Sequence, residues 1–171
     1  MGHQHRRSTP SRSRRSESGA AAVEFALVVP ILLLIVFGVI TFGMVFASQL
    51  SMNSAARDAA RAGVVQNLNA TGLSCSAIAT QARTQVDPLG GKATDVAVTV
   101  TGPDGSTSCS IAKNTAAVTG SSATTMCTNS NTYSGQLVVK LTYTANSPLN
   151  LIPAASSIPL SATGSFTCEY S

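Results

Sequence analysis

The longest apolar run in the chain lies near its N-terminus, between two polar regions. Residues 25–47 contain no charged side chain and follow directly after Glu24. A helix of that length is about 34 Å long, which is enough to cross a bilayer core of about 30 Å. The run is apolar on every face, so in water it would aggregate. The pattern therefore predicts a leader over residues 1–19 and a transmembrane helix over residues 20–47.

The helical pattern continues beyond the predicted span. Residues 49–62 are rich in alanine and contain neither Gly nor Pro. Arg57, Asp58 and Arg61 fall on a wetter side of this helix. The positions that can form one apolar stripe are Leu50, Met52, Ala55, Ala56, Ala59 and Ala62. We expect a single helix from about Ala20 to a C-cap at Gly63, or one further turn through Val65, kinked or locally melted at Pro30, with a disordered leader before it.

Downstream of this helix the period of the pattern changes. Residues 76–86 predict a short second helix, which Pro88 and the glycines at 90–91 end. Alternating segments then predict strands over 95–101, 106–113, 136–144 and 160–170. The intervening segments 114–135 and 146–159 read as connections. In the last strand the inward positions are expected to be Leu160, Ala162, Phe166, Cys168 and Tyr170.

These elements predict an α+β fold. A long N-terminal transmembrane helix extends into an exported domain over residues 48–171, where it lies with the short second helix on one face of a roughly four-stranded antiparallel sheet.

The formal net charge of +4 is confined to the leader. Residues 1–19 hold five arginines against one glutamate, whereas residues 20–171 hold six basic and six acidic side chains. Basic residues beside a span stay in the cytoplasm, so we expect a single-pass protein of the cell (inner) membrane with an extracytoplasmic C-terminal domain. A nucleic-acid interface is the alternative reading, but the arginines abut an apolar helix and no aromatic residue is interleaved.

The four cysteines agree with export. Cys75, Cys109, Cys127 and Cys168 all follow the span, no two form a C-x-x-C pair, and no His follows the span. Two disulfides in an oxidising compartment are therefore favoured over a zinc site. Four cysteines allow three pairings, which sequence leaves open. We expect Cys109–Cys127, which closes a short loop, and Cys75–Cys168, which ties the second helix to the last strand.

The chemistry-bearing residues do not form a candidate catalytic site. Without His, the exported region has no Ser–His, Cys–His or His–metal constellation, and its carboxylates are scattered singly. Phosphate-binding glycine loops are also absent from the sequence. We expect no enzyme activity, no cofactor, no metal, no nucleic acid and no small-molecule substrate.

The residues around the start of the span have a distinctive order. Gly19 precedes three alanines, Val23, Glu24 and Phe25, and the segment Asn-Ser-Ala-Ala-Arg-Asp-Ala-Ala-Arg-Ala-Gly follows over 53–63. This combination resembles the TadE-like family, the pseudopilins or minor pilins of tight-adherence (Flp-type) pilus assembly. The resemblance covers roughly residues 17–65, and the sheet domain lies outside it.

The resemblance implies roles for three residues. A prepilin peptidase would cut between Gly19 and Ala20, and Glu24, then the fifth residue, would pair with the N-terminal amine of a neighbouring subunit. The implied partners are the membrane, the peptidase, other pilins and the pilus assembly machinery, with possible incorporation into a pilus. Flp-type major pilins carry Tyr after the Glu, where this chain has Phe25.

Two other readings remain open on the sequence. An unprocessed, signal-anchored cell-surface domain with a binding or adhesion role explains the leader, the span and the cysteines equally well. A secretory signal cut before Ser48 is disfavoured, because the apolar run exceeds the usual signal core of about 7–15 residues.

Overall fold

The computed structural model describes residues 14–65, 72–88, 91–127, 135–146 and 157–168. Contacts within the chain divide it into two units, residues 1–40 and residues 41–171. The first helix, α1 (Arg14–Val64), begins in unit 1 and ends in unit 2. All other helices and strands of the described chain belong to unit 2.

Helix α1 matches the predicted long helix, with a correction at its N-terminal end. It continues through Pro30 without a melted turn. It begins at Arg14, so residues 14–18, predicted as disordered leader, are helical, because adding turns to an existing helix costs much less than nucleating one. At its C-terminal end it stops at Val64, between the two ends that the sequence allows. Residues 1–13 of the predicted leader lie outside the described residues.

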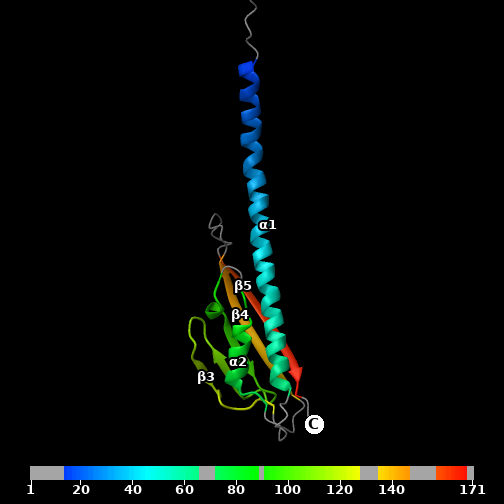
Figure 1. The fold of residues 1–171 in the computed structure, drawn as a ribbon, viewed down its shortest axis with the longest axis vertical. Coiled ribbons are helices and arrows are strands. Elements are labelled where there is room, and N and C mark those ends of the chain that lie inside the picture. Colours follow the sequence, from blue (N-terminus) through cyan, green and yellow to red (C-terminus); the bar gives the residue numbers. More distant parts are fainter. Residues whose placement is uncertain (1–13, 66–71, 89–90, 128–134, 147–156, 169–171) are drawn as a thin grey trace, which may run out of the picture. The chain divides into compact units, whose positions relative to one another are not determined.

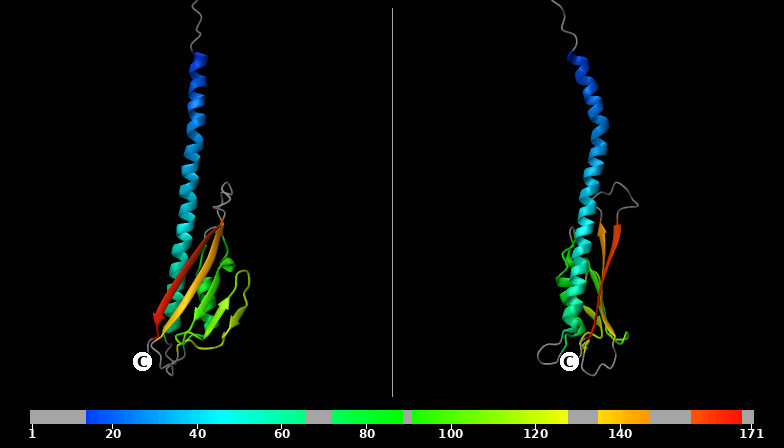
Figure 2. Two further views of the ribbon diagram at one scale, coloured as in Figure 1. Left: turned by 180° about the vertical axis from the view of Figure 1, so that it is seen from behind. Right: turned by 90° about the vertical axis from the view of Figure 1, so that its right-hand side faces the viewer.

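Unit 2 has two layers, as predicted: helices on one face of an antiparallel sheet (Figures 1 and 2). The helical layer contains residues 41–64 of α1 and the short helix α2 (Cys75–Thr84). Within the described residues the sheet has five strands, in the order β3-β2-β1-β4-β5. They are β1 (Ala97–Thr101), β2 (Ser108–Ile111), β3 (Val118–Gly120), β4 (Gln136–Asn146) and β5 (Ser157–Thr167), and a short 3-10 helix, η1 (Ala93–Asp95), precedes them.

The core forms where the predicted apolar faces meet. In α2, Ile78, Ala79 and Ala82 are fully buried. Alternate residues of the strands face the helices, and those at less than 2% exposure are Val98, Val100, Leu137, Val139 and Leu141. The period-two pattern therefore located the buried face of β1 and β4 correctly.

Small residues let α1 approach the sheet closely. Met52 and the alanines at 55, 56, 59 and 60 are buried, whereas Leu50, predicted in the same stripe, is 52% exposed. A Cβ added at Gly164 of β5 would collide with the backbone of Ala56 and lie 2.8 Å from the backbone nitrogen of Arg57. One added at Gly63 would lie 2.7 Å from Ile78 Cδ1. Backbone thus packs against backbone between α1 and β5.

The sheet differs from the prediction in three places. Strand β3 lies inside the segment predicted as a loop, because its three residues are too short to show alternation. Strand β5 begins at Ser157, inside the predicted connection, and contains Pro159. Proline is tolerated there because β5 is an edge strand, where a missing N–H breaks no ladder. Phe166, predicted to point inward, is 37% exposed, and Tyr170 lies outside the described residues.

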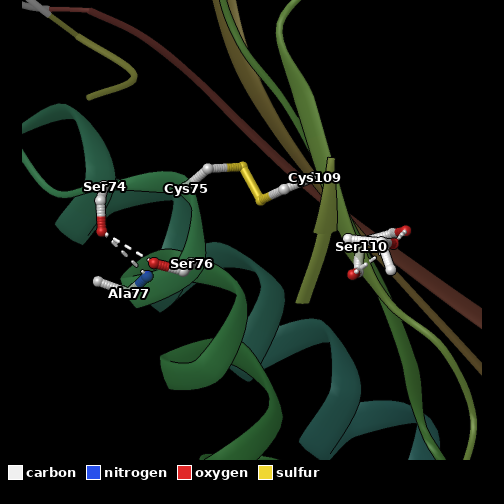
Figure 3. The surroundings of a disulfide bond; sticks show 7 residues. Ser74, Cys75, Ser76, Ala77, Cys109 and Ser110 are labelled. Carbon is white, nitrogen blue, oxygen red and sulfur yellow. Dashed lines mark hydrogen bonds between the residues drawn. A yellow bond between two sulfur atoms is a disulfide. The ribbon is translucent and has the colours of Figure 1, made fainter. Parts of the chain in front are cut away.

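The predicted disulfide pairing is wrong. The bonds are Cys75–Cys109 and Cys127–Cys168, with Cα–Cα distances of 6.1 Å and 5.7 Å. Figure 3 shows the first bond joining the start of α2 to β2. Loop length was a weak guide, since doubling a loop costs only about 0.6 kcal/mol. The layers decide the pairing instead, because Cys109 is buried on the sheet face that α2 covers.

The close approach of α1 to β5 gives a test by substitution. Gly164→Ala should destabilise the protein by about 1–3 kcal/mol, because the added methyl group overpacks a backbone contact. On an open strand the same change would be neutral or stabilising, since alanine loses less entropy than glycine. The measurement is thermal unfolding of the detergent-solubilised chain, with the exposed neighbour Ser165→Ala as control. Equal stability of the two variants would contradict the contact.

Candidate functional site

The residues proposed for cleavage and for the intersubunit ion pair lie near one another at the start of α1, in unit 1. Gly19, Ala20 and Glu24 are all exposed. Ala20 and Glu24 are four residues apart, so they share one face of the helix. Among the residues that the structure describes, no side chain forms a hydrogen bond or ion pair with Glu24. A carboxylate bordering a span without a partner is costly in lipid, which marks Glu24 as a candidate contact for another molecule.

The rest of α1 in unit 1 presents apolar side chains outward. Helix α1 contains a stretch long and apolar enough to cross a membrane, and none of that stretch is buried. Apolar side chains more than 60% exposed include Val23, Phe25, Leu27, Leu34 and Val39. Apolar groups with no protein cover need a nonaqueous environment. This helix is therefore a candidate membrane span.

Glycines leave gaps along the apolar helix. A Cβ added at Gly38 or Gly43 would meet no atom of the described chain within 4 Å. Four residues after Gly43 comes Ala47, which completes a small-xxx-small spacing. Phe42 and Phe46 directly precede Gly43 and Ala47, and their rings stack with centroids 6.2 Å apart. The helix surface thus alternates bulky rings with recesses.

In unit 2 one face of α1 is covered by the sheet and the opposite face is charged. Arg57, Asp58 and Arg61 are exposed, as the sequence predicted. Near the start of this part, the side-chain amide of Gln49 donates a hydrogen bond of 2.7 Å to the carbonyl oxygen of Ser161 in β5. The hydroxyl of Ser51 accepts a 3.0 Å bond from the backbone N–H of Asp87. Polar side chains therefore add to the alanine packing that holds α1.

Arg83 is a buried charge that the sequence analysis missed. It lies in the last turn of α2 and is only 7% exposed. Its Nε donates a 3.0 Å hydrogen bond to the carbonyl of Ala93, and its two Nη groups donate to the carbonyls of Thr94 and Thr115. The C-terminal end of a helix also favours a cation. Arg83 thus joins α2, η1 and the segment after β2, a structural role that no local motif signals.

Two titratable groups have shifted pKa values, and both have local causes. Hydrogen bonds from the Thr107 and Ser106 hydroxyls and backbone N–H groups hold the pKa of the Asp104 carboxyl well below its usual range. These bonds close the turn between β1 and β2. Burial, and the nearby charge of Asp95, raise the pKa of Tyr143.

A cavity of about 450 Å³ lies beside the exposed end of β4. Its charged lining residues are Asp95 and Lys113, and hydroxyl groups of Thr142, Thr144 and Ser161 add polar positions. Across the described part of the chain, no three His, Cys, Asp or Glu side chains come together in a way that could hold a metal ion. All four cysteines are in disulfides.

A comparison with family models assigns the N-terminal helix. The model described as TadE-like protein matches residues 19–61. No curated protein and no solved structure matches the chain significantly. The match ends at Arg61, so it includes both the candidate span and most of the alanine face that packs on the sheet.

The chain therefore carries a TadE-like domain within α1. This domain supports a pilin-like protein associated with tight-adherence pili, and the candidate span fits anchoring in a membrane. The TadE-like pilin family is in general non-enzymatic.

The contacts of Arg83 predict the effect of removing its charge. Arg83→Met keeps an apolar stem but removes three hydrogen bonds and leaves the Thr115 carbonyl without its donor, so it should cost about 1–3 kcal/mol of unfolding free energy. Arg83→Lys should fall between this variant and the parent, because an ammonium cannot reproduce the planar fork of donors. The measurement is chemical denaturation, and the control is Arg57→Met at an exposed site. Equal losses at positions 57 and 83 would contradict the assigned role.

Proposed function

We propose that this chain, which carries a TadE-like domain at residues 19–61, is a pseudopilin or minor pilin that acts in the assembly of a tight-adherence (Flp-type) pilus. The observation that carries the proposal is the family match itself, which begins at Gly19, the residue before the proposed cleavage point. The uncovered apolar surface of α1 supports the same role, since it leaves the helix available to other helices.

The proposed topology places residues 1–19 in the cytoplasm, residues 20–47 in the membrane and residues 48–171 outside the cytoplasm. The excess of arginines before the span supports this direction. Two disulfides in unit 2 support delivery of that unit to an oxidising compartment. The host membrane is then the cell (inner) membrane, from which the processed subunit can enter a pilus.

Processing would change the electrostatics of the helix start. Cleavage between Gly19 and Ala20 by a prepilin peptidase removes the five leader arginines and creates an ammonium group on Ala20. At low dielectric that ammonium and the Glu24 carboxylate neutralise each other, whereas either group alone would be costly. The bond lies in the first turns of α1, where local opening of a helix costs least. Glu24 of one subunit would pair with the amine of its neighbour.

Packing between subunits would use the apolar face of α1. Open positions at Gly38 and Gly43 allow another helix backbone to approach closely, which is how small residues promote helix association in lipid. The partners of the protein would therefore be other pilins and pseudopilins, the prepilin peptidase and the pilus assembly machinery. An unprocessed anchor with a binding or adhesion role is the competing outcome of the two experiments below.

Processing predicts a defined N-terminus. Mass spectrometry of the protein extracted from membranes should find a chain that begins at Ala20. Gly19→Val should block this cleavage, because a bulky residue replaces the small one before the bond, while the control Ala22→Val should still be cut. An intact leader in cells that assemble normal pili would reject processing in favour of the unprocessed anchor.

The proposed ion pair predicts a separate loss. Glu24→Gln should insert into the membrane normally but enter pili roughly tenfold less or worse, because the amine of a neighbour is left without its partner. The readout is the ratio of the subunit in sheared pili to that in the membrane fraction. Asp58→Asn, another exposed carboxylate of α1, is the matched control. Unchanged incorporation of Glu24→Gln would exclude the intersubunit role.

A further inference from the structure

The pairing of the cysteines follows their order in the chain. The first cysteine, Cys75, is bonded to the second, Cys109, and the third, Cys127, is bonded to the fourth, Cys168. We propose that a dithiol oxidase introduces these bonds one after the other as the chain emerges from the membrane, and that native pairing needs no disulfide isomerase. This inference rests on the proposed export of residues 48–171.

The first disulfide closes a ring around a segment with its own packing. Between Cys75 and Cys109 lie α2, η1 and β1, and α2 packs on both β1 and β2. Buried residues of this packing, such as Ile78 and Val100, lie inside the ring. Since α2, β1 and β2, which pack around this bond, all precede Cys127 in the chain, the bond can form before Cys127 arrives.

The second ring contains the longest ribbon of the sheet. Strands β4 and β5 pair from Gln136↔Thr167 to Asn146↔Ser157. Cys168 directly follows Thr167, at the open end of this ribbon. The two rings share no residues, because the first closes at Cys109 and the second begins at Cys127.

The structure also indicates why the order matters. The segment before Cys127 hydrogen-bonds to the residues around Cys75: the N–H of Cys75 donates to the carbonyl of Thr124 at 2.9 Å, and the N–H of Met126 donates to the carbonyl of Leu73 at 3.3 Å. A Cβ at Gly72 would lie 2.6 Å from the carbonyl oxygen of Cys127. Folding thus brings Cys127 close to Cys75. Prior closure of Cys75–Cys109 removes both thiols from competition with Cys168.

Simultaneous oxidation would favour a wrong pair. Cys109 and Cys127 are 18 residues apart in the sequence, against separations of 34 and 41 in the native pairs. Loop closure favours the shorter ring over the 34-residue one by about 2.6-fold in an unstructured chain. This wrong pair is the one that loop length alone predicts. Sequential emergence gives the native pair the advantage, because Cys75 and Cys109 are exposed to oxidant first.

The chemistry of each bond is a thiol–disulfide exchange. One cysteine thiolate attacks a sulfur of the oxidase disulfide and forms a mixed disulfide. The second cysteine thiolate then attacks the substrate sulfur of that mixed disulfide and displaces the oxidase. The two electrons and two protons of the substrate thiols end on the oxidase, which leaves as a dithiol. The oxidant is therefore a protein disulfide, and each native bond consumes one.

The test compares bacterial cells that lack the exported dithiol oxidase with cells that lack the exported disulfide isomerase. The full chain is expressed in both and in the parent cells, free thiols are alkylated at lysis, and pairing is assigned by mass spectrometry of peptides. Loss of the oxidase should lower the disulfide-bonded fraction at least severalfold. Loss of the isomerase should leave Cys75–Cys109 and Cys127–Cys168 unchanged within the error of the assay.

The variant Cys75→Ala serves as a positive control, because it tests whether the assay detects a non-native disulfide. In Cys75→Ala the partner of Cys109 is removed, so Cys109–Cys127 should form and Cys168 should stay reduced. For the unaltered chain, accumulation of Cys109–Cys127 in cells without isomerase would overturn the inference while leaving the proposed function intact. Four reduced thiols in the parent cells would instead contradict export, on which the proposed function also depends.

Discussion

Helix α1 has to satisfy two different environments with one uninterrupted backbone. Over residues 25–47 it carries no charge and most of its large apolar side chains are exposed, so this apolar surface requires lipid or other helices. In the next part of the helix, alanine side chains pack against the sheet and arginine side chains are exposed to solvent. Because the hydrogen bonds of a helix are internal, this change of surroundings needs no break in the backbone. The rest of unit 2 is built against the second part of this helix.

The size of the side chains sets how unit 2 is assembled. Alanines at the α1 face and Gly164 on β5 bring two backbones into contact, which leaves no room for larger groups. Apart from Met52 of α1 and Met126 before β4, the largest fully buried side chains, such as Ile78, Leu137 and Leu141, come from α2 and the strands. Such an interface gains little from each apolar side chain, since an alanine buries few atoms. Hydrogen bonds from Gln49 and to Ser51 therefore matter more here than in a leucine-rich core.

Much of the fold could be predicted because its elements are long and strongly patterned. The apolar run, the alanine stripe and the alternation of Val98 and Val100 each point to one type of element. Strand β3 could not be found this way, since three residues carry no usable period. Phe166 has the same parity as the buried positions of β5 but is 37% exposed, because alternation indicates a face of the sheet and not how fully each side chain on it is covered. The extra helical turn before Gly19 reflects helix propagation, which is not visible in residue patterns.

For the candidate site, sequence order identified Gly19, Ala20 and Glu24, and the family match covers the same segment. The roles proposed for them depend on a peptidase and on a neighbouring subunit, so the geometry of one chain cannot supply them. Disulfide pairing and Arg83 needed the structure for a different reason. Both depend on which segments meet across long stretches of sequence: Cys75 meets a strand 34 residues away, and Arg83 binds carbonyls on two later segments. Local spacing contains no information about such contacts.

The covalent links divide unit 2 in a way that bears on how it could transmit force. Both disulfides lie downstream of α1, joining α2 to β2 and the segment before β4 to the end of β5. The contacts of α1 with the described part of unit 2 are noncovalent: its alanines pack near Gly164 of β5, Gln49 hydrogen-bonds to β5, and Ser51 hydrogen-bonds to the segment after α2. If a force pulls α1 away from the sheet, the two disulfides still hold the segments that they join. The noncovalent contacts between α1 and the sheet are then the ones that the force acts on. The small residues of that interface, more than the disulfides, therefore determine how firmly the helix holds the domain.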